Sequence, residues 1–222
     1  MALVCEFELT QCRGYTDEVE VPQEVTSLGP GVFEGKTRLR KVVLPPKLKR
    51  IGKKAFTNCS NLTALELPDS LTAIDDDAFR GCRKLEEMML PKGVLRVGKK
   101  AFFDCKALRA IHLGKRLRAL GAQAFQGCAA LEYIEIPEGV TRIEREAFRN
   151  CSALEEVEIP EGVTVIEAGA FQGCSSLLEV ELPSTLQRIE SKAFAGCVQL
   201  RGLVYPEGFE YLAEDALEGV GE

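Results

Sequence analysis

The 222-residue sequence has no tryptophan and a single histidine, His112. Histidine is the usual general acid–base residue and a common ligand of catalytic metals, so one copy leaves little material for either role. No stretch reaches the roughly 18 apolar residues that a membrane-spanning helix needs. Glu6 and Glu8 interrupt the first residues, which therefore lack the apolar run of a signal peptide. We expect no metal, no cofactor and no membrane insertion, with a cytoplasmic location for the chain as given.

Charge is plentiful but unevenly distributed. Charged residues make up 28% of the chain and apolar residues 45%, as in soluble globular proteins, and the net charge of −6 is not that of a nucleic-acid or anionic-membrane binder. Residues 1–32 contain 1 basic and 6 acidic side chains, residues 33–118 contain 21 and 9, and residues 119–222 contain 6 and 19. This pattern predicts a basic middle and an acidic far half. It favours steering of a partner or head-to-tail self-association. The sequence argues against binding of nucleic acid to the basic part, because aromatic residues are not interleaved there.

The chain repeats itself every 23 residues. A proline column runs with this period from Pro22 to Pro206, with Gly114 replacing proline once. The phenylalanine column consists of Phe33, Phe56, Phe79, Phe102, Phe125, Phe148, Phe171 and Phe194. Leucine and aliphatic columns keep the same period, and alanine usually precedes the phenylalanine. Several columns in register without an insertion are typical of a solenoid.

One period indicates the course of one coil. Residues 131–136 alternate and end at Pro137, which predicts a short strand. Residues 140–143 form a second short extended piece on the opposite side. Residues 144–150 suit a single helical or 3₁₀ turn that places Phe148 in the core. A coil cannot bury its apolar face alone, so stacked coils share one continuous core.

These columns resemble the BspA-type leucine-rich repeat family, whose unit is similar to residues 131–151 and whose resemblance extends over residues 16–217. The resemblance implies a right-handed leucine-rich-repeat-like coil of about nine units with a parallel β-sheet on the concave face. We divide the chain into an N-terminal cap and first strand (1–21), the repeat solenoid (22–205) and a degenerate C-terminal capping repeat (206–222). In the cap, residues 7–10 with Gly14 and Tyr15 predict a strand or hairpin.

Seven cysteines form another column, namely Cys59, Cys82, Cys105, Cys128, Cys151, Cys174 and Cys197. A straight column cannot surround one metal ion, and side chains stacked in the same direction do not face one another as disulfide partners do. We predict small buried reduced thiols, which fit a reducing compartment. Cys5 and Cys12 lie outside the column and are the remaining candidates for redox chemistry.

Two motifs imitate catalytic or ligand sites. Residues 93–100 nearly match a phosphate-binding loop, but Lys100 replaces the hydroxyl that would ligate magnesium. The same stretch also aligns with an ordinary part of the repeat. Asp75, Asp76 and Asp77 lack the glycine and distal glutamate of a calcium loop, so we predict a solvated turn. His112 has no aligned nucleophile and orienting acid, and we interpret it as a surface contact.

Function is expected on the solvent-facing positions of the main strands. Period-two alternation sends two residues of each strand outward. The middle coils then expose an apolar and aromatic strip, and the later coils expose stacked glutamates. The predicted partner-binding residues are Lys41, Val43, Glu66, Glu87, Met89, His112, Tyr133, Glu135, Glu156, Glu158, Glu179 and Glu181.

The sequence therefore predicts a non-enzymatic scaffold that binds a protein partner on the concave strand face. The family resemblance implies an alternative, in which the chain is the ligand-binding fragment of a secreted or cell-surface adhesin. A self-associating structural protein is the third hypothesis. The chain is expected to be a monomer or to associate weakly head to tail.

Overall fold

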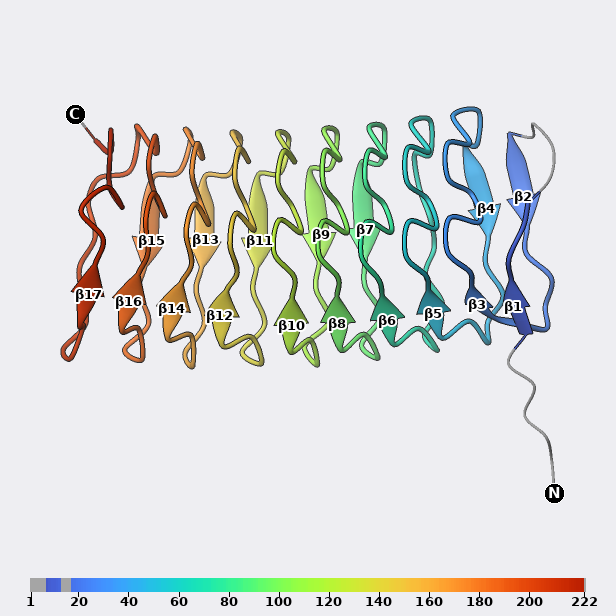
Figure 1. Ribbon diagram of the computed structural model, residues 1–222, viewed down its shortest axis with the longest axis horizontal. Coiled ribbons are helices and arrows are strands. Elements are labelled where there is room, and N and C mark those ends of the chain that lie inside the picture. The colour runs from blue at the N-terminus through green and yellow to red at the C-terminus, as the bar shows by residue number, and fades with distance from the viewer. Residues whose placement is uncertain (1–6, 13–16, 222) are drawn as a thin grey trace, which may run out of the picture.

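The computed structural model describes residues 7–12 and 17–221. The predicted cap residues Gly14 and Tyr15, and Cys5, lie outside the described residues. Consecutive coils lie side by side in chain order along one long axis, so that the two ends of the array are the two ends of the sequence (Figure 1). All pairs of neighbouring strands are parallel and join residues of successive coils. The predicted repeat solenoid is confirmed.

Two walls of short strands flank the core. The main wall follows the leucine column and consists of β2 (Glu18–Glu20), β4 (Lys41–Val43), β7 (Glu87–Met89), β9 (Ala110–His112), β11 (Tyr133–Glu135), β13 (Glu156–Glu158) and β15 (Glu179–Glu181). The second wall follows the proline turn. Its strands are β1 (Phe7–Leu9), β3 (Val25–Leu28), β5 (Arg50–Ile51), β6 (Ala73–Ile74), β8 (Arg96–Val97), β10 (Ala119–Leu120), β12 (Arg142–Ile143), β14 (Val165–Ile166), β16 (Arg188–Ile189) and β17 (Tyr211–Leu212).

The phenylalanine column forms the centre of the core. All eight rings, from Phe33 to Phe194, are fully buried. Neighbouring rings stack with centroids 5.0 Å apart at the Phe33–Phe56 pair and 5.6 Å at the Phe125–Phe148 pair, with the other pairs between these values. The ring spacing therefore matches the spacing of parallel strands, about 4.8 Å, within a small offset. One aromatic ring per coil fills the space between the walls.

The predicted helical or 3₁₀ turn before the cysteine places Phe148 in the core as expected, but it forms no helix, and the described residues contain none. Cys151 donates its N–H to Phe148 O within its own turn at 3.1 Å, but the N–H of Phe148 donates to Ala170 O in the next coil at 2.8 Å. Asn150 has a φ of 60°. A left-handed residue interrupts an α-helix and turns alternate N–H groups sideways. The segment is thus a series of tight turns that bonds laterally to its neighbour.

The second wall is interrupted at one junction, which we call the seam. It splits into a sheet that ends at β10 and a sheet that begins at β12. At the following junction, Thr164 N–H donates to Thr141 O at 3.1 Å and Glu167 N–H donates to Ile143 O at 2.9 Å. The matching bonds from Thr141 and Glu144 back to the coil of β10 are missing among the described residues. The second wall therefore opens between these two coils.

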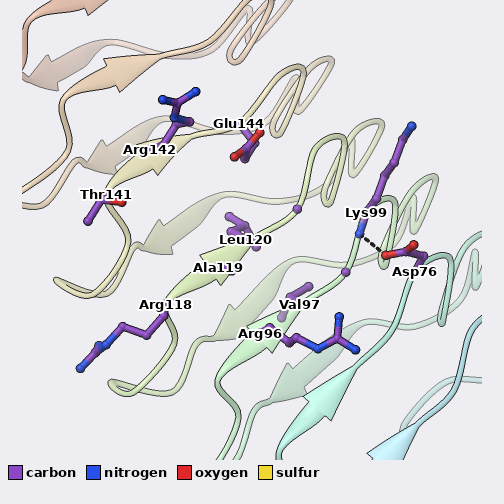
Figure 2. Close-up of a pocket in the computed structure, with 12 residues that line it drawn as sticks. Asp76, Arg96, Val97, Lys99, Arg118, Ala119, Leu120, Thr141, Arg142 and Glu144 are labelled. Carbon is purple, nitrogen blue, oxygen red and sulfur yellow. Dashed lines mark hydrogen bonds between the residues drawn. The ribbon is translucent and has the colours of Figure 1, made fainter.

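The Arg118 side chain lies at the seam. Its Nη1 donates to Leu117 O at 3.3 Å, and the same atom stands 1.8 Å from the point where a Cβ on Gly139 would be. Only a glycine at position 139 leaves room for this guanidinium between the two coils. A cavity of about 360 Å³ lies beside it, with Thr141 and Glu144 on its far side (Figure 2). The main wall is weakened at the same junction, since β11 and β9 share the single register pair Tyr133↔Ala110.

Replacing Phe102 with alanine should lower the free energy of unfolding by about 3–5 kcal/mol, because it removes a fully buried ring from the middle of the stack. Urea unfolding followed by circular dichroism measures the change. Phe103→Ala is the matched control, because Phe103 is only partly buried. A loss below about 1 kcal/mol for Phe102→Ala would place the ring outside the core.

Hydrogen exchange of the backbone amides should detect the open seam. The amides of Thr141 and Glu144 should exchange at least about tenfold faster than those of Thr164 and Glu167, which occupy the same positions one coil later and are bonded. Arg118→Thr, which removes the guanidinium beside Gly139, should slow exchange at Thr141 and Glu144. Equal protection at both junctions in the unsubstituted chain would contradict an open seam.

Candidate protein-binding surface

The structure places all twelve predicted partner-binding residues on the solvent side of the main wall, where each is exposed. Eleven lie in strands β4 to β15, and Glu66 lies in a coil whose main-wall segment forms no strand. Each strand shows an exposed, buried, exposed pattern or a close variant, as in β7 and β13. The predicted alternation is therefore confirmed, and we call the exposed surface that carries these twelve side chains the main face. The binding of a partner there stays a prediction.

Apolar side chains mark the first half of the main face. Met89 is 70% exposed, Tyr133 48% and Val43 43%. His112 is exposed next to Met89, its register partner. An exposed Met side chain adapts its shape to a partner, and a Tyr side chain buries much area at low conformational-entropy cost, and both residue types are enriched at protein interfaces.

A cavity that sequence reasoning missed lies within this half. The segment 64–66 pairs with neither β4 nor β7, so the main wall is interrupted on both sides of it. A cavity of about 480 Å³ lies there, lined by Arg40, Lys41 and Val43 on one side and by Ala64 and Glu66 on the other. Ala64 is the only signal in the sequence, because it places a small side chain where the main face would otherwise be filled. The main face is thus hollowed where its positive and apolar residues meet.

Stacked carboxylates form the second half of the main face. The register pairs Glu156 with Glu179 and Glu158 with Glu181, and Glu135 with Glu158. Like charges directly opposite each other across parallel strands repel. The single ion pair of this set among the described residues joins Glu179 to Arg201 at 3.6 Å. We call these stacked residues, Glu135, Glu156, Glu158, Glu179 and Glu181, the carboxylate ladder. It keeps a negative potential that is largely unneutralised.

The negative potential of the carboxylate ladder affects the pKa of Tyr133, which lies at its start. Partial burial raises the pKa of Tyr133, and the negative charges of Glu135, Glu158 and Glu156 raise it further. The phenol therefore stays protonated and is available as a hydrogen-bond donor. Tyr133 joins the apolar and the acidic halves of the main face.

The seven column cysteines are buried and free, as predicted, and Cys12 is a free, partly buried thiol of the cap. Each column thiol donates to the carbonyl oxygen of the phenylalanine in the preceding coil, for example Cys128 Sγ to Phe102 O at 3.2 Å and Cys59 Sγ to Phe33 O at 3.0 Å. Sequence reasoning found the burial but missed this bond. The column is a set of lateral ties between coils.

Neither imitation motif is a ligand site. In residues 93–100, Gly98 faces the preceding coil, where an added Cβ would lie 2.5 Å from the backbone of Asp75 and Asp76. The backbone that would cradle a phosphate is therefore occupied by the chain itself. The prediction of a solvated turn is wrong for Asp75, which is 5% exposed. Its Oδ2 accepts from Arg50 Nε at 2.7 Å and its Oδ1 accepts from Arg96, so it ties three coils together.

No group of three or more histidine, cysteine or acidic residues in the described part of the chain could hold a metal ion. The same residues include no helix that could cross a bilayer.

Stacked parallel strands, one leucine column and one phenylalanine per 23-residue coil define a leucine-rich-repeat solenoid. The model of the BspA type leucine rich repeat region, built from 6 copies, matches residues 7–132 and 96–220. The chain belongs to this family, and the resemblance seen in the sequence is confirmed. No curated protein matches the chain in sequence.

Solved structures are similar over most of the chain. A leucine-rich repeat protein of T. pallidum has a TM-score of 0.62 and 28% identity, covering 87% of this chain and 82% of that one. A leucine-rich repeat protein of Bacteroides ovatus has a TM-score of 0.55 and 22% identity, covering 91% and 76%. The pneumococcal vaccine antigen PcpA has a TM-score of 0.52 and 20% identity, covering 94% and 69%. The last two likenesses establish the fold alone.

The buried thiols should make the protein sensitive to alkali. Burial raises the pKa of Cys59 and Cys197 from 9.0 to about 12, and it raises the pKa of the five thiols between them. The unfolded chain releases these protons at a pH where the folded chain keeps them. The contribution of these thiols to the free energy of unfolding should therefore be fully present below about pH 9. It should fall as the pH rises toward 12, by about 1.4 kcal/mol per pH unit for each thiol.

Urea unfolding at about pH 8, 9 and 10 measures this slope. Cys105→Ala combined with Cys128→Ala should lower the slope by the share of two thiols. A variant carrying Leu108→Ala and Leu131→Ala is destabilised with its thiols intact, so it should keep the original slope. An unchanged slope in the cysteine variant would refute the assignment of the alkaline loss to the column.

Proposed function

We propose that this chain is a non-enzymatic scaffold that binds another protein on the main face. The observation that carries the proposal is the row of exposed side chains on successive coils that passes from Val43 and Met89, through Tyr133, to the carboxylates of β13 and β15. Membership in a leucine-rich repeat family supports a protein-interaction role. Solenoids of this kind offer an extended, preformed surface. The scaffold therefore loses little conformational entropy when a partner binds.

The chemistry of the main face describes the partner. The ladder carries five carboxylates, Glu135, Glu156, Glu158, Glu179 and Glu181, and repulsion among them destabilises the free protein. Lysine or arginine side chains of a partner would relieve that repulsion and steer the encounter. An apolar segment of the same partner would cover Met89 and Tyr133. We therefore expect an extended partner surface with an apolar end and a basic end.

The ligand-binding part of a secreted or cell-surface adhesin is the second candidate, and the family membership favours it. It would use the same main face, and the two candidates differ in the compartment of the partner. An enzymatic role finds little support on this surface. His112 is exposed, and its side chain makes no hydrogen bond or ion pair with the described residues.

Affinity capture from a cell lysate and from a mixture of extracellular proteins tests the proposal. A variant carrying Glu135→Lys, Glu158→Lys and Glu181→Lys should retain the partner at least about tenfold less than the unchanged chain, because attraction becomes repulsion at three places. The matched control reverses Glu138, Glu207 and Glu210 to lysine, which are equally exposed but lie off the main face. Equal loss in both variants would reject the main face as the site. The mixture that supplies the partner decides between the two candidates.

A further inference from the structure

Arginines recur at one position of the second wall in every other coil. The column consists of Arg50, Arg96, Arg142 and Arg188, and Ala73, Ala119 and Val165 take the same position in the coils between them. The register pairs Arg50 with Ala73, Ala73 with Arg96, and Arg96 with Ala119. Successive arginines of this column therefore flank one short apolar side chain, about two strand spacings apart. We call the three intervals between them the first, middle and third gaps.

The first and third gaps each contain a carboxylate of the chain. In the first gap, Asp75 Oδ2 accepts from Arg50 Nε at 2.7 Å and Asp75 Oδ1 accepts from Arg96. In the third gap, Glu167 Oε1 lies 2.6 Å from Arg142 Nη1. A carboxylate has two oxygens that accept from guanidinium groups, so one carboxylate can bridge two arginines.

The middle gap, between the arginines of β8 and β12, has no carboxylate at this position. Gly121 stands where the other two gaps have Asp75 and Glu167. A Cβ on Gly121 would lie 2.5 Å from the backbone N of Lys99 and 2.6 Å from the carbonyl carbon of Gly98. The close approach of the two coils therefore excludes a side chain that could fill the gap.

The seam cavity of about 360 Å³ lies in the middle gap. Arg96, Ala119 and Arg142 belong to its lining, and Figure 2 shows the strand of Ala119 between those of the two arginines. Small-molecule sites have volumes of about 300–1,000 Å³. The middle gap is thus large enough for a small ligand.

Two cations of the lining are not neutralised by the chain. Arg118 donates from Nη1 to the carbonyl of Leu117, and among the described residues neither Arg118 nor Lys99 has an ion-pair partner. The surrounding sequence is also strongly basic, since residues 91–131 contain nine lysines and arginines and a single acidic residue, Asp104. The potential at the cavity is therefore positive.

Two acidic residues line the cavity as well. Asp76 Oδ1 accepts from the backbone N–H of Lys99 at 2.9 Å. Glu144 is partly buried, and its carboxylate has no hydrogen bond or ion pair with a described residue. The lining has four cationic side chains and these two carboxylates, which leaves an excess of two positive charges.

The seam adds two backbone donors. In the other described coils from residue 49 to residue 210, the N–H at the position of Thr141 donates to the preceding coil. The same holds for the N–H at the position of Glu144 in the other described coils from residue 29 to residue 213. Thr141 and Glu144 lack these bonds, and both line the cavity. Their N–H groups are available to an oxyanion.

We propose that the seam cavity binds a small ligand with two negative charges on oxygen, either a phosphate monoester or a dicarboxylate. An anionic group of the ligand lies between Arg96 and Arg142, as the carboxylates of the chain lie in the first and third gaps. Lys99 and Arg118 supply the charge that the chain leaves unneutralised. The site uses side chains and the open edge of the seam, not the backbone of residues 93–98 that imitates a phosphate-binding loop.

The cavity lies on the second wall, so this proposal does not depend on the binding of a protein at the main face, and either can fail alone. Calorimetric titration of the purified chain with inorganic phosphate, glycerol phosphate and succinate, in about 20 mM chloride, tests it. We expect glycerol phosphate or succinate to bind with a dissociation constant of about 1 mM or below, and the tighter of the two identifies the source of the oxyanion. Failure of all three anions to bind at about 10 mM would overturn the proposal.

Charge variants test the assigned side chains. Lys99→Gln combined with Arg118→Gln should weaken binding at least about tenfold, and Glu144→Gln should tighten it at least about threefold, because it removes the unpaired carboxylate. The matched control is Arg83→Gln combined with Lys84→Gln, which removes the same charge from exposed positions away from the cavity and should bind like the unchanged chain. Equal weakening in the control, or no tightening in Glu144→Gln, would contradict the site.

Hydrogen exchange locates the ligand independently of its affinity. A saturating concentration of the ligand should slow exchange of the amides of Thr141 and Glu144 at least about fivefold. The amides of Thr164 and Glu167, which are already bonded to the preceding coil, should exchange as before. Unchanged exchange at Thr141 and Glu144 would place the ligand outside the seam and overturn the proposal.

Discussion

The lateral backbone hydrogen bond between successive coils is the interaction on which the rest of the molecule depends. The turn before each cysteine uses left-handed residues, such as Glu146 and Asn150, to point alternate N–H groups at the next coil. A single coil therefore satisfies only part of its backbone, and one phenylalanine ring per coil is too little core to stand alone. Stacking provides both the missing hydrogen bonds and the missing apolar contacts. The array is cooperative for this reason, and its surface is free to vary.

The lateral stacking of coils also arranges equivalent surface residues in regular rows. A residue type that recurs at one position of the repeat is repeated in space at the strand spacing, with its backbone held by its neighbours. Charges that would be scattered on a globular protein are therefore aligned, as in the carboxylate ladder of β11, β13 and β15. Some charges of the second wall are neutralised between coils, as Asp75 is by Arg50 and Arg96. Among the described residues, the carboxylate ladder of the main face has one such pair, Glu179 with Arg201, which distinguishes it from the second wall.

The sequence predicts those features that are set within one coil and repeat with its 23-residue period. The buried phenylalanine and cysteine columns and the exposed positions of the main strands follow from the repeat alone, because burial alternates along a strand. The turn before Cys151 forms no helix, and glycine at positions 81, 127 and 173, which align with Asn150, already indicated a left-handed residue there. The burial of Asp75 could not be predicted, since it rests on two arginines from neighbouring coils. The seam likewise requires the contact of Arg118 with Gly139, which no column shows.

The seam and the change of charge occur at the same place in the chain. Residues 33–118 contain 21 basic and 9 acidic side chains, residues 119–222 contain 6 and 19, and Arg118 is the last basic residue before the acidic half. Bending the solenoid at this junction breaks no backbone bond of the second wall, whereas bending elsewhere breaks several. A bend that opens the second wall closes the main wall, which at this point carries His112 and Tyr133. The curvature of the main face is therefore set most easily where its apolar half meets its acidic half.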